Sequence, residues 1–248
     1  MVNLVEAQKP LLHFLIKWAG LRQHTVDVDG AGTVLTFWVP KDKVPGNNST
    51  VAPAEKQSET SKAKGVRRPS VVLVHGFAAE GIVTWQFQVG ALAKHYDVYI
   101  PDLLYFGGST SSAELLLPES VKGLKALLSI AAHRRLWFPE RLHRDFLEVM
   151  FTNRKERAEL LEGLVVSNKD ATVPVLPQKI LLLWGHNDNI FNIELAKTMK
   201  EQLGEKTMLQ SIDKAGHLVH LERPCVYNQH LMEFLAYATA EASKESAN

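Results

Sequence analysis

The chain of 248 residues has one cysteine, Cys225, and almost no charge excess, because 28 Lys and Arg stand against 27 Asp and Glu. A single cysteine excludes an internal disulfide framework and is typical of a reducing compartment. Without a basic excess that would neutralise phosphates, nucleic acid is not expected as the main partner. We therefore expect a cytoplasmic protein that does not act on nucleic acid.

Long hydrophobic runs are also missing, since no apolar stretch approaches the roughly 18 residues of a membrane-spanning helix. Residues 11–18 are apolar, but Glu6 precedes them, Lys17 interrupts them and no basic region leads them, so a secretory signal is not expected. Residues 4–18 have helical periodicity. We expect their apolar face to dock on the protein's own core, with peripheral membrane contact as the open alternative. That face consists of Leu4, Ala7, Leu11, Leu15 and Trp18.

Short apolar runs alternate with amphipathic stretches along most of the chain. Alternation of this kind predicts an α/β fold with a mostly parallel sheet that helices cover on both faces. The predicted strands are 24–28, 33–39, 71–74, 96–100, 179–184 and 208–212. The predicted helices are 4–18, 85–95, 119–133, 139–151, 154–164, 193–203 and a last one after Pro224.

The helical stretch in the middle of the chain separates two expected parts of the core. Residues 1–114 form the N-terminal part of the core and include a polar segment, 41–69, that we expect to be a flexible loop. The three central helices contain no strand and suggest a lid over residues 115–177. Residues 178–236 then complete the core, and 237–248 form a polar tail.

The apolar run at residues 71–74 ends abruptly at His75-Gly76. A run bounded by turn formers is typical of a strand buried on both faces. The glycine lets the backbone turn away and present N–H groups at the end of the strand, where open α/β sheets bind ligands. In an enzyme, this loop is the expected place for an oxyanion hole.

Two further polar side chains follow predicted strands. Asp188 comes after the strand at 179–184, and His217 comes after the next strand. An acid and a histidine at one sheet edge suit an orienting carboxylate and a general base. Taken singly, the acid could be a turn residue and the histidine a loop residue bonded to backbone. His217 and His220, with Glu222, suggest a metal site as an alternative, but their spacing lacks a third convincing ligand, so we disfavour it. No glycine-rich phosphate-binding pattern is present, so no cofactor is expected.

Four groups of residues occur in an order that is typical of one enzyme family. They are His75-Gly76-Phe77, Pro101-Asp102 with Phe106-Gly107-Gly108-Ser109, Trp184-Gly185-x-x-Asp188, and Gly216-His217 with Glu222 and Pro224. On these motifs the chain resembles the α/β-hydrolase-fold family and is similar to its plant esterase/lipase-like branch. The resemblance implies that Asp188 and His217 are the acid and base of a Ser-Asp-His triad. It also implies that Phe77 and Ala78 supply the oxyanion hole and that the substrate is a small apolar ester or another small molecule.

The nucleophile that this resemblance requires is missing from the sequence. The serine of the family lies in G-x-S-x-G on a sharp strand-to-helix turn, whereas no two of the 15 glycines are four residues apart. Ser109 does stand two residues after a glycine, but it follows the strand at 96–100, one strand too early for the elbow. We interpret it as a turn or capping residue.

The sequence also indicates where a segment has been lost. Residues 111–114 are a helix capping box, yet three leucines then run into Pro118, which ends any helix after about one turn. We expect a junction near Glu114/Leu115 in a shortened isoform, with a natural lineage lacking the elbow as the alternative. Loss of central strands would leave unpaired backbone groups. Three interpretations follow: a hydrolase-family protein with impaired catalysis, a non-catalytic small-ligand-binding protein, or an unstable truncated product.

Overall fold

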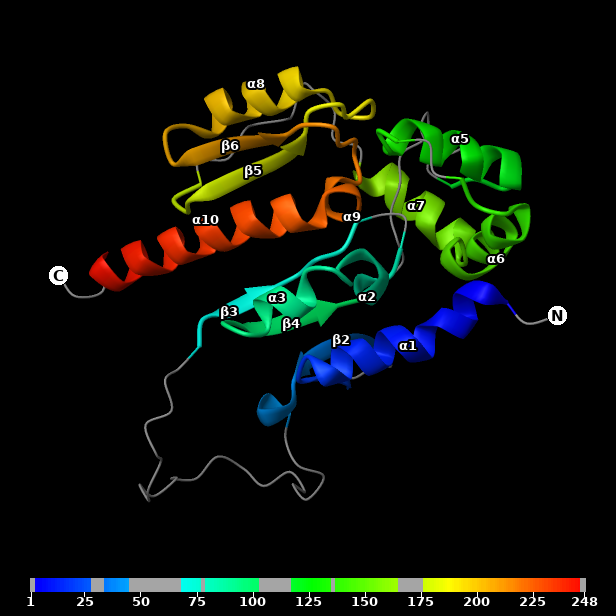
Figure 1. The fold of residues 1–248 in the computed structure, drawn as a ribbon, viewed down its shortest axis with the longest axis horizontal. Coiled ribbons are helices and arrows are strands. Elements are labelled where there is room, and N and C mark those ends of the chain that lie inside the picture. The colour runs from blue at the N-terminus through cyan, green and yellow to red at the C-terminus, as the bar shows by residue number, and fades with distance from the viewer. Residues whose placement is uncertain are drawn as a thin grey trace.

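The computed structural model describes residues 3–27, 34–44, 68–76, 79–102, 117–134, 137–164 and 176–245. Helices and strands alternate along these ranges, which confirms the predicted α/β class (Figure 1). The strands are β1 (Leu21–Asp27), β2 (Val34–Pro40), β3 (Ser70–Val72), β4 (Asp97–Pro101), β5 (Ile180–Gly185) and β6 (Thr207–Ile212). The helices are α1 (Leu4–Trp18), α2 (Gly81–Thr84), α3 (Val89–Leu92), α5 (Val121–Ala131), α6 (Glu140–Met150), α7 (Arg154–Leu164), α8 (Ile193–Leu203), α9 (Val219–Glu222) and α10 (Pro224–Glu245).

Four strands form one sheet in the order β1-β2-β4-β3. The first two pair antiparallel, as expected for strands that follow each other closely in the chain, and β2 pairs antiparallel with β4. Only β3 and β4 run parallel in this sheet, so it is more mixed than predicted. The reason is that a β–α–β crossover joins β3 to β4, through α2 and α3, whereas the first strands follow each other without an intervening helix.

The strands β5 and β6 form a second, separate sheet of two parallel strands. The long helix α10 connects the two sheets by packing (Figure 1). Leu231, Met232 and Leu235 of α10 pack against the core of the four-stranded sheet, while Val226 and Tyr227 pack beside β6. One helix therefore holds together two sheets that share no described backbone ladder.

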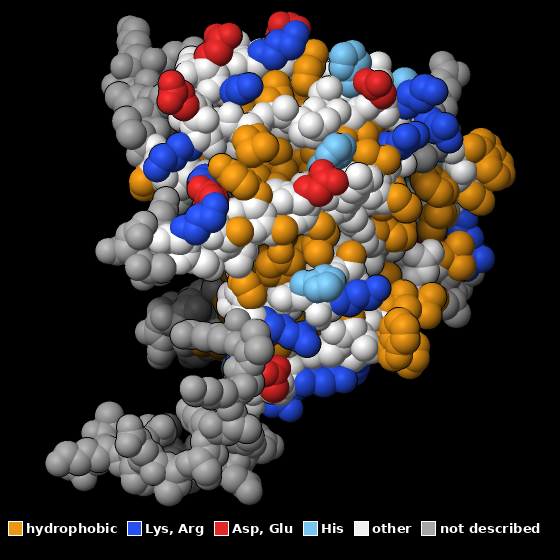
Figure 2. Space-filling model, turned by 60° about the vertical axis from the view of Figure 1, so that its left-hand side comes forward, with side chains coloured by type: hydrophobic (Ala, Val, Ile, Leu, Met, Phe, Trp, Pro, Cys, Tyr) orange, Lys and Arg blue, Asp and Glu red, His pale blue; other side chains and the backbone are white. Residues whose placement is uncertain are grey.

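The edge of β3 that does not face β4 is open in the described part of the chain. The side chains of Val72, in β3, and of Val74, just after it, are 60% and 53% exposed. Hydrophobic side chains also reach the surface in several patches on the face shown in Figure 2. Native proteins usually protect an edge strand that carries exposed β-branched side chains. The sequence hypothesis of lost neighbouring strands predicts an edge of this kind.

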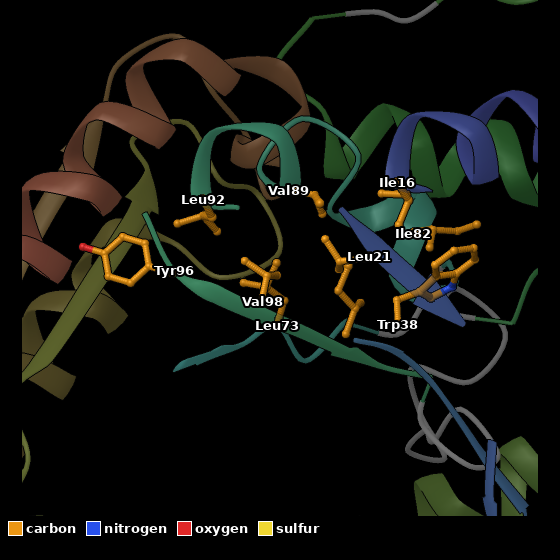
Figure 3. Packing of buried hydrophobic residues seen from close by; sticks show 10 residues of the cluster. Ile16, Leu21, Trp38, Leu73, Ile82, Val89, Leu92, Tyr96 and Val98 are labelled. Carbon is orange, nitrogen blue, oxygen red and sulfur yellow. The ribbon is translucent and has the colours of Figure 1, made fainter. Parts of the chain in front are cut away.

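The buried hydrophobic side chains gather in three clusters. The largest lies between the four-stranded sheet and helices α1, α2, α3 and α10 (Figure 3). A second cluster joins the start of α1 to α5 and α6, and a third lies beside β6 and α9. The main cluster consists of Ile16, Leu21, Trp38, Leu73, Ile82, Val89, Leu92, Tyr96, Val98 and Ile100.

Two helical predictions need correction. The stretch 85–95 is helical only over Val89–Leu92, flanked by turns, and a separate short helix, Gly81–Thr84, precedes it. Gly90 lies in the short segment, and glycine is a poor helix former. In α1 the face predicted to dock on the core is the exposed one, because Val5, Leu12 and Ile16 make the inward contacts instead.

The other elements lie close to their predicted places, and α8 has the predicted bounds. Most of the segment 41–69 lies outside the described residues, apart from a 3-10 turn at Lys41–Lys43. The expected junction at Glu114/Leu115 also lies outside them. The division into a core and a lid over residues 115–177 stays a prediction.

Candidate active site

Asp188 and His217 come together at one edge of the two-stranded sheet. Since β5 and β6 are parallel and Gly185 lies opposite Ile212, the loops after both strands leave the sheet on the same side. The imidazole Nδ1 of His217 lies 3.0 Å from the carboxylate Oδ2 of Asp188. The carboxylate is buried and the imidazole is partly exposed. This is the juxtaposition that the sequence predicted.

The second oxygen of Asp188 holds the loop that carries it. Its Oδ1 accepts hydrogen bonds from the backbone N–H groups of Ile190 and Phe191 at 2.8 and 2.9 Å. The ring of Phe191 meets the imidazole of His217 edge-on, with 5.4 Å between the centroids. The carboxylate is therefore fixed by backbone donors, and the imidazole is held between a carboxylate and an aromatic ring.

Glycine is required on both loops because the two backbones approach each other closely. A Cβ atom on Gly185 would collide with the carbonyl oxygen of Gly216. A Cβ atom on Gly216 would lie 2.7 Å from the carbonyl oxygen of Ala131 and 2.7 Å from the backbone nitrogen of His133. The glycines before Asp188 and His217 thus let the two loops and the end of α5 meet.

Glu222 ties the histidine loop to the end of α5. Its Oε1 accepts from the N–H of Gly216 at 2.8 Å, and its Oε2 accepts from the N–H groups of His133 and Arg134 at 2.9 and 3.2 Å. The sequence placed Glu222 in a motif but did not reveal this role. This role was not recognisable from spacing, because two of the three backbone donors, at His133 and Arg134, lie about 90 residues away along the chain.

His75 lies in the loop after β3 and is buried. Its Nδ1 donates to the carbonyl of Gly76 at 2.9 Å, and its Nε2 lies 4.0 Å from Asp102 Oδ1. That carboxylate oxygen also accepts from the N–H of Gly81 at 3.0 Å. Burial lowers the pKa of His75 and raises the pKa of Asp102. Phe77 and Ala78, the predicted oxyanion hole, lie outside the described residues.

A cavity of about 440 Å³ adjoins His217 and Gly76. Its walls are mainly apolar, as is usual for small-molecule sites. Among the described residues that line it, the only hydroxyl group belongs to Thr84, whose Oγ1 donates to the carbonyl of Ala79 at 3.4 Å. The apolar lining comes mostly from α1, α5 and α6: Val5, Leu12, Leu124, Leu127, Leu128, Ala131, Leu142, Phe146 and Met150.

The alternative metal site finds no support in the geometry. Among the residues that the structure describes, no cluster of three or more His, Cys, Asp or Glu side chains could hold a metal ion. His220 instead lies against the rings of Trp85 and Tyr227, at 5.4 and 6.1 Å between centroids. Burial lowers its pKa to about 4. Glu222, the third candidate ligand, is occupied by backbone donors.

Comparison with known proteins places this geometry in a fold class. No family model matches the chain. A segment of 55 residues, 22% of the chain, is 36% identical to the uncharacterised hydrolase YugF of Bacillus subtilis, and the chain spans only 20% of the length of that relative.

Solved structures match over much longer stretches. A membrane phospholipase A described as a bacterial virulence factor superposes with a TM-score of 0.68 at 17% identity, covering 95% of this chain and 91% of that one. A 2-hydroxy-6-oxo-6-phenylhexa-2,4-dienoate hydrolase of Rhodococcus gives 0.60 at 16%, covering 87% and 99%. The carboxylesterase CesB of Bacillus subtilis gives 0.55 at 13%, covering 92% and 98%. The fold is therefore that of the α/β-hydrolases.

Within the described ranges, no helix has both the length and the apolar character needed to cross a membrane.

Proposed function

We propose that this chain derives from serine hydrolases of carboxylic ester or acyl substrates and that its own catalysis is impaired. The observation that carries the proposal is the hydrogen bond between Asp188 and His217 beside an apolar cavity, in a sequence without G-x-S-x-G. The similarity to an esterase, a phospholipase and another hydrolase supports the substrate class. The resemblance to the plant esterase/lipase-like branch is part of this proposal.

The two catalytic side chains have clear roles in the parent chemistry. Asp188 would hold the imidazole in one tautomer and stabilise the imidazolium, while His217 would take a proton from an alcohol. Gly76 begins the loop that would supply oxyanion N–H groups through Phe77 and Ala78. Without an alcohol for His217 to activate, no acyl-enzyme forms, and only weak water-mediated hydrolysis remains.

The separation of the two sheets supports the loss of a central block near Glu114/Leu115. In the parent fold, the serine elbow follows a further strand of the sheet. Here β3 ends the four-stranded sheet, Val72 in it and Val74 after it are exposed, and β5 begins a separate sheet. Sequencing of the encoding gene tests this directly. We expect an exon encoding G-x-S-x-G between codons 114 and 115, and a continuous gene without it would favour a natural lineage.

An active-serine phosphonate probe tests the impairment. We expect that the probe does not label the purified chain stoichiometrically. We also expect the chain to hydrolyse p-nitrophenyl esters at most about tenfold faster than its His217→Ala variant. A serine esterase of the same fold serves as the positive control. Stoichiometric labelling that disappears in the His217→Ala variant would overturn the proposal, because it would reveal a functional nucleophile.

A second candidate function is non-catalytic binding of a small apolar ligand. The cavity favours it, since its described lining offers no serine or cysteine and is mainly apolar. A ligand that binds only the folded state raises the melting temperature. Stabilisation by fatty acids or their esters, without turnover, would support this function. A chain with no cooperative thermal transition would instead be an unstable truncated product.

We also propose a cytoplasmic location. Cys225 is exposed and unpaired, which suits a reducing compartment. Fluorescence microscopy of the tagged full chain in its native cells tests this location.

A further inference from the structure

Helix α1 presents a continuous apolar face to solvent. Trp18 is 81% exposed, Phe14 is 63% exposed and Leu11 is 60% exposed, and these residues follow one another at intervals of three and four. Leu4 and Leu15 extend the same face and are also exposed. Soluble proteins rarely expose so many large apolar side chains on one helix face. This exposure indicates that a partner covers the face.

The opposite side of α1 is a wall of the cavity. Val5, Gln8, Lys9 and Leu12 line that cavity, and His217 lines it from another element. One helix thus separates the candidate active site from an exposed apolar surface. The short distance across a helix, about 10 Å, places the cavity next to whatever covers the outer face.

We propose that α1 docks on the surface of a lipid bilayer through Leu4, Leu11, Phe14, Leu15 and Trp18. Phenylalanine, leucine and tryptophan on one helical face are the side chains that interfacial helices insert below the headgroups. Tryptophan at the end of the helix suits the boundary between headgroups and acyl chains. The lipid that lies against α1 is then the source of apolar ligands for the cavity, a consequence that rests on the proposed acyl-ligand function.

The shape of the face favours a bilayer over a second copy of the chain. Its exposed side chains lie in one narrow row along a single helix of 15 residues, about 22 Å long. A stable protein–protein interface needs about 800 Å² of complementary surface from each partner, whereas a bilayer needs no matching protein surface.

The charges on α1 indicate insertion rather than electrostatic attraction. The helix carries Glu6, Lys9 and Lys17, a net charge of +1. Lys9 is paired with Glu6 at 3.0 Å and with Glu80 at 2.9 Å. Little positive charge remains to attract anionic headgroups, so we expect binding to neutral lipid and little loss at high salt.

Flotation of the full chain with phosphatidylcholine vesicles tests this proposal. We expect the chain to float with the vesicles at both 0.1 M and about 1 M salt. The F14S/W18S variant should bind at least about tenfold more weakly, because two large apolar side chains no longer insert. The Leu195→Ser variant is the matched control, because Leu195 is an exposed leucine on helix α8. It should bind like the unaltered chain.

Quenching by brominated lipid adds a measurement that does not depend on loss of binding. Trp18→Phe keeps the face apolar, so this variant should still float while its tryptophan quenching falls. Failure of the unaltered chain to float, equal flotation of F14S/W18S, or a dimer in light scattering that this variant abolishes would each overturn the proposal. Vesicle binding involves no chemistry, so flotation without acyl-ligand binding would leave the docking intact and refute only the second candidate function, ligand binding.

Discussion

Asp188 uses both carboxylate oxygens, and each has a different task. Oδ1 accepts two backbone N–H groups, whereas Oδ2 faces His217. The first task organises the loop after β5, and the second serves the imidazole. The two tasks can be separated experimentally, because removal of the histidine leaves the backbone hydrogen bonds in place.

We therefore expect Asp188→Ala to lower the free energy of unfolding by about 2 kcal/mol, because two backbone donors lose their acceptor. Asp188→Asn keeps an acceptor oxygen and should cost about 1 kcal/mol. His217→Ala should cost less than about 1 kcal/mol, since its side chain is partly exposed. Urea denaturation of the three variants measures these differences. Equal costs for His217→Ala and Asp188→Ala would refute a structural role for Oδ1.

His220 gives the fold a dependence on pH. Burial lowers its pKa in the folded state to about 4, whereas an unfolded histidine titrates near 6.5. Between these values the unfolded chain binds a proton that the folded chain does not. Stability therefore rises with pH across this window, is complete above about 6.5, and falls by up to about 3 kcal/mol toward pH 4.

Urea denaturation of the unaltered chain and of His220→Gln at intervals from pH 4.5 to 7.5 measures this contribution. The variant should be less sensitive to acid, although not insensitive, because burial lowers the pKa of His75 as well. Identical pH profiles for the two proteins would contradict the assignment. The comparison isolates His220, since both proteins retain His75.

At the scale of the element, β3 is an edge strand of the four-stranded sheet. Val72 of β3 is 60% exposed, and unpaired strand edges are sites where other chains pair. Val72→Lys should slow aggregation severalfold and change the free energy of unfolding by less than about 0.5 kcal/mol. Static light scattering during incubation at moderate temperature measures the rate. Leu195→Lys, an exposed change on α8, controls for the added charge, and an equal effect of both would refute the edge as the cause.

Most elements could be predicted from sequence because their apolar periods are clear. The strands at 180–185 and 207–212 were predicted within one residue, and their parallel order places Asp188 and His217 at one edge. The face of α1 could not be predicted. Its apolar arc is wide, and periodicity does not say whether the stripe with Leu11 or the neighbouring stripe with Leu12 and Ile16 meets the core. Long-range packing decides that choice.

At the scale of the whole molecule, two separate sheets share one site. The loop after β3 reaches the cavity from the first sheet through Gly76, and His217 reaches it from the second. Helix α10 contacts both sheets, since Leu231 packs against the core of the four-stranded sheet and Tyr227 packs against the cluster beside β6. The absence of G-x-S-x-G could be read from the sequence. The bridge through α10 could not, since the contacts of this helix depend on long-range packing.

The hydrogen-bonded pair of Asp188 and His217 predicts that insertion of a serine elbow gives this chain acyl-transfer activity. A block consisting of strand, Gly-x-Ser-x-Gly elbow, helix and strand, taken from an esterase of the same fold, would be inserted between Glu114 and Leu115. The new strands should cover the edge of β3 and place the serine near His217, because Asp188 and His217 already form their hydrogen bond at 3.0 Å.

The chimaera should then react stoichiometrically with the phosphonate probe and hydrolyse p-nitrophenyl esters at least about 10³-fold faster than the unaltered chain. Replacement of the inserted serine by alanine, or His217→Ala, should abolish both effects while leaving the circular dichroism spectrum unchanged. A folded chimaera that the probe does not label would show that the remaining Asp188–His217 pair no longer has the geometry of a triad. The loss of that geometry would then have preceded or accompanied the proposed loss of the serine.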